Sequence, residues 1–326
     1  MLLYIVKRFA EVVMILFFIA TATFFLTALV PGNPIAERVE RLPAATRENL
    51  YRRYGLDKPL GQRYLITMRN LLQGDFGESI IYPGQTVQSI LRDKWQVSAR
   101  LGLQQLILGI GVGLFLGIIA AVKKGSPADY FVVFFCVLLV SVPHLIFGLL
   151  LQKVFGGTFA LFPVIGWPKG GDLWLGGWNY TILPTLTGCF SYIAAYARLL
   201  KTSMLDVLNQ DYILTARAKG LTEWQIIRRH VLRNAFVPIV TKLPMSLAMC
   251  VTGSFFIERV FAIPGIGMYY VNAVNQRDIP IIMGETVILA ILFMAVIFIT
   301  DILYSFIDPR IRLKGPLRAE KEAVHG

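Results

Sequence analysis

The chain has 326 residues, of which 56% are apolar and only 16% are charged. An ordinary soluble domain carries about 25% charged residues, and the mean hydropathy of +0.61 is too high for a surface exposed to water. The composition therefore excludes a disordered chain and argues against a soluble enzyme. The net charge of +12 is compatible either with nucleic-acid binding or with the cytoplasmic loops of a membrane protein.

The apolar residues are gathered into six blocks, each long enough for a membrane-spanning helix of about 20 residues. In chain order, the predicted spans are Phe9–Val30, Leu101–Val122, Tyr130–Phe155, Thr181–Leu200, Phe236–Ile257 and Ile281–Phe306. Pro143 and Pro184 interrupt the third and fourth spans, which membrane helices tolerate where neighbouring groups satisfy the freed carbonyls. The basic residues before the first block are also typical of a secretory signal, but the block is longer than the apolar part of a signal. We therefore interpret it as an uncleaved span.

Lysine and arginine are distributed unevenly between the short loops, and this predicts the orientation of the chain. With the N-terminus in the cytoplasm, sixteen of these residues are cytoplasmic and five are not, leaving aside the long segment after the first span and Arg100 at its boundary. We therefore expect both termini in the cytoplasm, and the positive charge needs no nucleic acid. The expected domains are an N-terminal segment with the first span (1–30), a small extracytoplasmic domain (31–99), a five-helix core (100–306) with a cytoplasmic loop (201–235), and a cytoplasmic tail (307–326).

Motifs for covalent chemistry or nucleotide hydrolysis are absent from the sequence. No glycine is followed by lysine, so there is no phosphate-binding Walker A loop, and the three histidines and three cysteines show neither metal-binding nor disulfide spacing. Uphill movement of a solute would therefore require an ion gradient or a partner that hydrolyses ATP. Glu258 and Glu285 are placed near the outer surface, where simple contact with water is one interpretation, and no series of acids crosses the bilayer as a proton relay would require.

The cytoplasmic segment 211–238 predicts two helices joined by a tight turn. Asp211–Lys219 has the pattern of a helix, Gly220 is a good C-terminal stop, and Thr222 is placed to cap a second helix that runs to about residue 234. Apolar residues at helical spacing would form a stripe on this loop, namely Leu221, Trp224, Ile227 and Val231. Two interpretations remain: an amphipathic helix on the lipid surface, or a knob inserted into a groove of a cytoplasmic partner.

This segment resembles the signature of a known family. Thr215-Ala216-x-x-x-Gly220, followed at a fixed distance by Leu232 and Pro238, is similar to the EAA signature of the membrane subunits of binding-protein-dependent ABC importers.

The departures from the general signature are Leu214 in place of its Glu, Thr215 in place of its first Ala and Arg233 in place of its later Pro. The resulting form, Tyr-Ile-Leu-Thr-Ala-Arg-Ala-Lys-Gly-Leu, is similar to that of the oligopeptide/dipeptide/nickel branch. Other blocks resemble the same branch: Val30–Pro34, Tyr54–Pro59, Gly74–Ser79, Phe261–Gly267, Arg277–Pro280 and Asp308–Arg310. The long outer domain after the first span resembles the B-type permease of oligopeptide importers.

The resemblance implies an all-α membrane protein with six transmembrane helices and a type I ABC importer architecture. Such a permease is not an enzyme itself and carries no cofactor or metal. It forms half of the translocation pathway for oligopeptides in the bacterial cytoplasmic membrane. The implied partners are a second, C-type permease subunit, two cytoplasmic ATPase subunits that bind ATP and Mg, an extracytoplasmic peptide-binding protein and the lipid bilayer.

The resemblance also identifies the loop around Gly220 as a coupling helix, which sits in a groove of an ATPase subunit. The residues expected at this contact are Ala216, Lys219, Gly220, Leu221, Glu223 and Trp224. Ala216 and Gly220 would offer small surfaces for close approach.

Two further features concern the translocation pathway. Gly109, Gly113 and Gly117 recur every four residues in the second span, so they share a face on which another backbone can approach closely. This face serves either static helix packing or sliding during the change of access. The segment Phe261–Gly267, with Pro264 and Gly265, is either an outer gate or a plain connecting turn.

Alternative functions remain open from the sequence alone. The same architecture would serve for dipeptides, nickel or another small solute, since a separate binding protein selects the substrate. A gradient-driven secondary carrier would work without an ATPase partner. A membrane scaffold would show no substrate-stimulated ATP hydrolysis.

Overall fold

The computed structural model describes residues 2–29, 43–44, 47–48, 51–52, 58–82, 84–168, 170, 174–251 and 254–307. These residues are helical apart from turns, bends and one isolated antiparallel bridge between Glu78 and Thr86. The predicted all-α architecture is therefore confirmed. Much of the predicted outer domain, nearly all of the predicted tail, the motif blocks Val30–Pro34 and Asp308–Arg310, and most of Tyr54–Pro59 lie outside the described residues.

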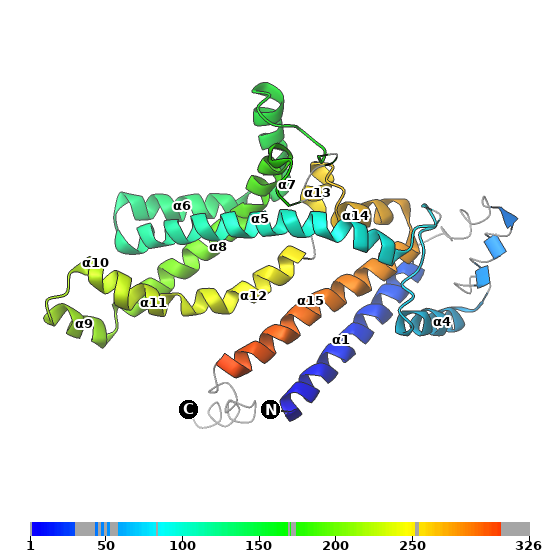
Figure 1. Ribbon diagram of the computed structural model, residues 1–326, viewed down its shortest axis with the longest axis horizontal. Helices are drawn as coiled ribbons and strands as arrows, with labels where there is room; N and C mark the ends of the chain where they lie inside the picture. Colours follow the sequence, from blue (N-terminus) through cyan, green and yellow to red (C-terminus); the bar gives the residue numbers. More distant parts are fainter. Residues whose placement is uncertain are drawn as a thin grey trace. The chain divides into compact units, whose positions relative to one another are not determined.

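The chain forms two compact units (Figure 1). Of the described residues, those up to Arg92 and from Asn272 onwards make up unit 1, and Asp93–Val271 make up unit 2. This division cuts through the predicted core 100–306, because the sixth predicted span packs with the first.

Unit 1 is built on two long apolar helices, α1 (Leu2–Ala28) and α15 (Ile279–Ile307). They lie against each other in opposite directions, with the ring of Phe9 near the start of α1 placed 6.3 Å from the ring of Phe298 near the end of α15 (Figure 1). The beginning of α1 and the end of α15 are therefore at the same end of this helix pair. The shorter helix α4 (Leu60–Leu72) packs on α1 through Tyr64.

Two of the motif blocks, Gly74–Ser79 and Arg277–Pro280, contact each other in unit 1 at the turn that precedes α15. The Ser79 hydroxyl donates a hydrogen bond to Oδ2 of Asp278 at 2.5 Å, and the backbone N–H of Ile80 donates to Oδ1 at 3.3 Å. Gly284 lies so close to the carbonyl of Phe76 that any side chain there would clash. Burial raises the pKa of Asp278, although the hydrogen bond from Ser79 opposes this effect.

The raised pKa of Asp278 leads to a pH-dependent stability. The folded chain keeps this proton at a pH where the unfolded chain has lost it, so the free energy of unfolding falls as pH rises from about 4. Asp278→Asn removes the titrating group. The measured quantity is the melting temperature of the parent minus that of Asp278→Asn, both in detergent. We expect this difference to be smaller at neutral pH than at acidic pH. A difference that stays constant or increases over this range would contradict the prediction.

Unit 2 contains long helices that run beside one another and shorter helices at their ends. Its elements are most of α5 (Val87–Val122), α6 (Pro127–Ser141), α7 (His144–Leu151), η1 (Gln152–Thr158), α8 (Trp178–Leu208), α9 (Asp211–Ala218), α10 (Glu223–Ile226), η2 (Ile227–Val231), α11 (Leu232–Ala235), α12 (Val237–Val251), α13 (Phe255–Val260) and the first part of α14 (Ile266–Gln276). The short helices α9, α10 and α11 gather at one end of α8, and α7 and α13 at its other end (Figure 1).

The third predicted span, 130–155, is interrupted at Pro143, as the sequence indicates, and whether it crosses the membrane as one broken span stays a prediction. α6 ends at Ser141, α7 begins at His144, and the two are bent by 97°. The cause is Pro143, which disfavours helical backbone in the residue before it. Val142 is accordingly extended, with φ −96° and ψ 126°.

Pro184, in contrast, lies inside α8 without ending it. The fourth predicted span, Thr181–Leu200, lies within this 31-residue helix, which is about 46 Å long at 1.5 Å per residue. Among the described residues, four helical stretches are long and apolar enough to cross a membrane, and the bent pair α6–α7 would make a fifth. α8 is long enough but less apolar, so six spans remain a prediction.

The three glycines that recur every four residues in the second predicted span, Gly109, Gly113 and Gly117, all face α8 at backbone distance. A Cβ atom built on Gly113 would lie 2.8 Å from the carbonyl oxygen of Ile193, and one on Gly117 would lie 2.7 Å from that of Ala197. A Cβ on Gly109 would lie 3.0 Å from the carbonyl oxygen of Cys189. Helix backbones can approach this closely only through such small residues.

Gly113→Leu should therefore separate α5 from α8 and lower stability by about 1–3 kcal/mol, the usual effect of overpacking. Gly111→Leu in the same helix is the matched control, because in the described part of the chain no heavy atom beyond the adjoining helix backbone lies within 4 Å of its Cβ position. The check is the melting temperature of both variants in the same detergent. Equal losses in the two variants would show that crowding against α8 is not the cause.

Candidate coupling site

Gly220 ends the first helix of the loop 201–235, as predicted. Its φ of +79° is a left-handed conformation that glycine adopts without strain. The N–H of Gly220 donates to the carbonyl of Arg217 at 2.9 Å, and the N–H of Leu221 donates to the carbonyl of Ala216 at 3.4 Å. The chain therefore reverses within two residues and leaves Gly220 exposed. Among the described residues, none apart from its chain neighbours has a heavy atom within 4 Å of its Cβ position.

Thr222 caps the second helix, also as predicted. Its hydroxyl accepts from the N–H of Gln225 at 3.4 Å, while the side chain of Gln225 accepts from the N–H of Thr222 at 3.0 Å. This reciprocal pair is a capping box. The helix then continues to Ala235 through a π-helical turn at Ile227–Val231.

An ion pair crosses the turn between the two helices. Nε of Arg217 lies 2.9 Å from Oε1 of Glu223. Both side chains are largely exposed, so the pair adds only about 0–1 kcal/mol. A further bond, from Nδ2 of Asn234 to the hydroxyl of Tyr212 at 3.0 Å, joins α11 to α9. The loop is therefore held by its own local interactions.

The loop has a buried side and an exposed side. Trp224 is 64% exposed and Leu214 is 60% exposed, although both are large and apolar. Lys219 and Glu223 are exposed beside them, and Leu221 is half-buried.

The predicted stripe is only partly confirmed, because Ile227 and Val231 are buried in unit 2. Ala216 is also buried, at 5% exposure, among apolar residues of the unit. Its small volume therefore serves packing inside the chain, and the expectation that it offers a surface to a partner is not supported. Gly220 is exposed as expected.

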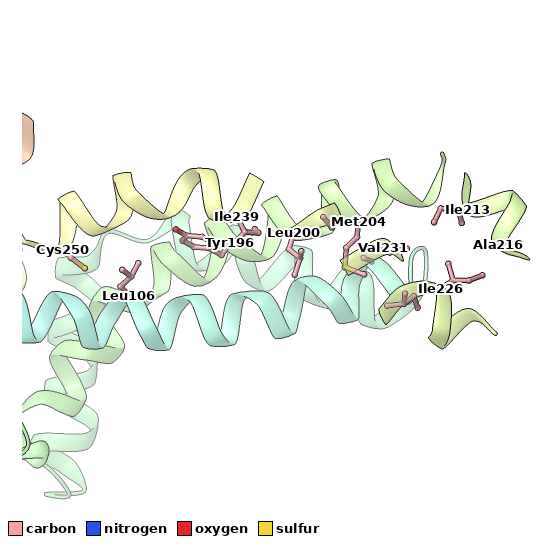
Figure 2. Packing of buried hydrophobic residues seen from close by; sticks show 13 residues of the cluster. Leu106, Tyr196, Leu200, Met204, Ile213, Ala216, Ile226, Val231, Ile239 and Cys250 are labelled. Atoms are coloured by element: carbon pink, nitrogen blue, oxygen red, sulfur yellow. The ribbon is translucent and has the colours of Figure 1, made fainter. Parts of the chain in front are cut away.

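The buried side of the loop is continuous with the core of unit 2 (Figure 2). In Figure 2 the side chains extend from Cys250 and Leu106 at one end, past Tyr196, Leu200 and Met204 of α8, to Ile226 and Ala216 at the other. The full cluster is Leu106, Ala121, Tyr196, Leu200, Met204, Ile213, Ala216, Ile226, Ile227, Val231, Ala235, Ile239 and Cys250. Because close-packed cores have few voids, a displacement of the loop would be passed to α5, α8 and α12.

The predicted gate residues lie in a turn between α13 and α14. Gly265 is buried and Pro264 is half-buried. The carbonyl of Phe261 accepts a hydrogen bond from the N–H of Gly166 at 2.8 Å, and the N–H of Ile263 donates to the carbonyl of Glu258 at 2.8 Å. The turn is thus fixed to its surroundings in this conformation.

The structure contradicts the interpretation that Glu258 and Glu285 are in contact with water. Glu258 is 0% exposed and Glu285 is 1% exposed. An apolar helix does not reveal which of its faces is covered by protein, so no pattern in the sequence identified these positions.

Other charged groups in the helices of unit 2 have local partners. The ammonium of Lys242 lies 5.4 Å from the centre of the Tyr196 ring, and that of Lys201 is 2.5 Å from Oδ1 of Asp129. Within the described residues, no group of three or more His, Cys, Asp or Glu is placed to hold a metal ion. The three cysteines are buried and unpaired.

Comparisons with known proteins agree with this arrangement. The sequence model of the family "binding-protein-dependent transport system inner membrane component" matches residues 113–313, and the model of the N-terminal part of such components matches residues 1–82. The dipeptide transport system permease protein DppB of Lactococcus lactis subsp. cremoris is 39% identical over 313 residues, covering 96% of this chain and 100% of the relative. The oligopeptide transport system permease proteins OppB of Haemophilus influenzae and Escherichia coli K12 are 36% and 34% identical, with the same coverage.

Among solved structures, the fold is similar to the crystal structure of an amino acid ABC transporter with histidines. The TM-score is 0.50 at 14% sequence identity, covering 68% of this chain and 94% of the other. The chain therefore belongs to the family of inner membrane components of binding-protein-dependent transport systems, and it is a permease subunit of an ATP-driven importer rather than its ATPase.

Proposed function

We propose that this permease forms half of a pathway for the import of peptides. The support is that relatives at 34–39% identity, aligned over nearly all of the chain, are named dipeptide and oligopeptide permeases. A C-type permease would complete the pathway, and an extracytoplasmic peptide-binding protein would deliver the substrate. Dipeptides, nickel or another small solute remain alternatives within this architecture.

The cytoplasmic loop would couple the pathway to the ATPase subunits, which bind ATP and Mg. The observation that carries this proposal is an exposed, self-supported turn whose buried side is part of the core of unit 2. Trp224 would be the apolar anchor, with Lys219 and Glu223 at the rim and Gly220 and Leu221 allowing close approach. A large aromatic residue exposed in water is typical of such binding sites.

The proposed location is the bacterial cytoplasmic membrane with both termini in the cytoplasm. The lysine and arginine distribution supports this orientation. The start of α1 and the end of α15 also lie at the same end of their helix pair (Figure 1). The contact of Gly109, Gly113 and Gly117 with α8 would keep the core rigid during the change of access, and the turn at Pro264 and Gly265 would belong to the outer gate.

The first test is Gly220→Trp in the assembled importer, reconstituted in vesicles. The indole would occupy space that is open within this chain but filled by the ATPase in the proposed complex. We expect ATP-driven uptake of labelled trialanine to fall at least tenfold, while the permease remains folded in the membrane.

Gly220→Ala is the matched control, because it introduces the same left-handed strain at φ +79° without the bulk. It should retain most of the uptake. Normal uptake by Gly220→Trp, or equal losses in both variants, would refute docking at this turn.

A second test separates docking from stability at two neighbouring residues. Trp224→Ala should change the free energy of unfolding of the permease by no more than about 0.5 kcal/mol, as is usual for surface substitutions, so its melting temperature should be nearly unchanged. It should nevertheless reduce the amount of ATPase that stays bound to the permease on purification. Ile226→Ala, at a site with 0% exposure, should instead lower stability by about 2–5 kcal/mol. Full retention of the ATPase by Trp224→Ala would rule out its role as the anchor.

The rival of another class is a gradient-driven secondary carrier. It requires solute accumulation in vesicles that contain this chain, an ion gradient and no ATPase. Accumulation under those conditions would overturn the proposed function.

A further inference from the structure

The buried carboxylate of Glu258 lies at the N-terminus of another helix. Glu258 belongs to α13, and α14 begins at Ile266 after the turn. Oε2 of Glu258 accepts from the N–H of Met268 at 3.2 Å, and the N–H of Gly267 also donates to this carboxylate. These two donors belong to the first turn of α14, where a helix provides no acceptors of its own.

Ser98 of α5 supplies the remaining acceptor. Its hydroxyl oxygen accepts from the N–H of Ile266 at 2.9 Å, and the hydroxyl also hydrogen-bonds to the Glu258 carboxylate. Ser98 is itself 1% exposed. The first three N–H groups of α14 are thus satisfied by side chains of α13 and α5, which lie far apart in the sequence.

The glycines of the Phe261–Gly267 motif make this arrangement possible. A Cβ atom on Gly265 would collide with both Oε2 of Glu258 and the hydroxyl of Ser98. A Cβ atom on Gly267 would lie 2.8 Å from the Cα of Phe255. Gly265 is therefore required for the close approach of the two capping side chains, and Gly267 for the close approach of the start of α13. This gives a physical reason for a motif that the coupling site leaves unexplained.

We infer that Glu258 and Ser98 are positioning residues, which cap α14 and fasten the outer turn 261–267 to α5. α5 also contributes Leu106 and Ala121 to the core that includes the cytoplasmic loop. The cap therefore completes a route, entirely within unit 2, from the proposed ATPase contact to the outer turn. This inference rests on the proposed function in one respect, namely that the turn belongs to the gate of an ATP-driven importer.

The test uses the complete importer in vesicles with Glu258→Gln, which replaces one acceptor oxygen by an amide donor facing the N–H groups. Amide hydrogen exchange at residues 266–268 should become about fivefold faster, as expected when a helix cap is lost. ATP hydrolysed per labelled trialanine imported should rise at least fivefold. Ser98→Ala should shift both measurements in the same direction. If Glu258→Gln does not assemble into the importer, Ser98→Ala provides the test instead.

Thr187→Val is the matched control, because it removes a buried hydroxyl whose one hydrogen bond within the described part of the chain goes to the carbonyl of Leu183 in its own helix. It should leave both the exchange at 266–268 and the ATP-to-peptide ratio unchanged.

The two measurements decide between distinct outcomes. Unchanged exchange in the assembled Glu258→Gln and Ser98→Ala variants would overturn the cap. Faster exchange with an unchanged ATP-to-peptide ratio would overturn the positioning role and leave only a structural one. A parent complex without ATP-driven uptake would refute the proposed function instead, while the exchange measurement would still decide the cap.

Discussion

Backbone contact between α5 and α8 is the constraint on which the rest of unit 2 depends. Lipid is as apolar as leucine, so helices in a membrane gain little from the hydrophobic effect and associate through close packing. Gly109, Gly113 and Gly117 allow this approach, and residues of α8 such as Leu200 and Met204 then reach the buried side of the loop 201–235. The position of the loop is therefore set by the helix pair rather than by a partner.

The loop is also organised before any partner binds. Gly220 reverses the chain, Thr222 caps the next helix, and the core fixes the buried face. A surface that is already ordered loses less conformational entropy on binding than a flexible one. For a coupling element this matters twice, since a flexible loop would both bind more weakly and absorb the motion that it must transmit.

The parts that sequence predicted were those fixed by local chemistry. A left-handed stop at Gly220 and a cap at Thr222 depend on residues within a few positions, and the helices followed from apolar length. Pro143 and Pro184 show where local chemistry is insufficient: Pro143 breaks its helix, whereas Pro184 lies inside the continuous helix α8. The sequence does not predict that Ile227 is buried in the protein, for a related reason. An apolar side chain is stable against both lipid and protein, so the residue type does not indicate which of the two it contacts.

The environment of an acidic residue in this apolar chain is equally hard to predict from the sequence. A carboxylate in a membrane protein first suggests an ion path or a solvated surface, and both interpretations treat it as isolated. Glu258 and Asp278 instead accept hydrogen bonds from backbone N–H groups at chain turns, where the bonding of a helix is incomplete. In a solvent that offers no hydrogen bonds, a helix that starts inside the protein must find its acceptors on side chains, and a carboxylate can serve several donors at once. Acceptors are therefore needed wherever the backbone turns inside the protein, and each such site also ties together segments that the sequence leaves far apart.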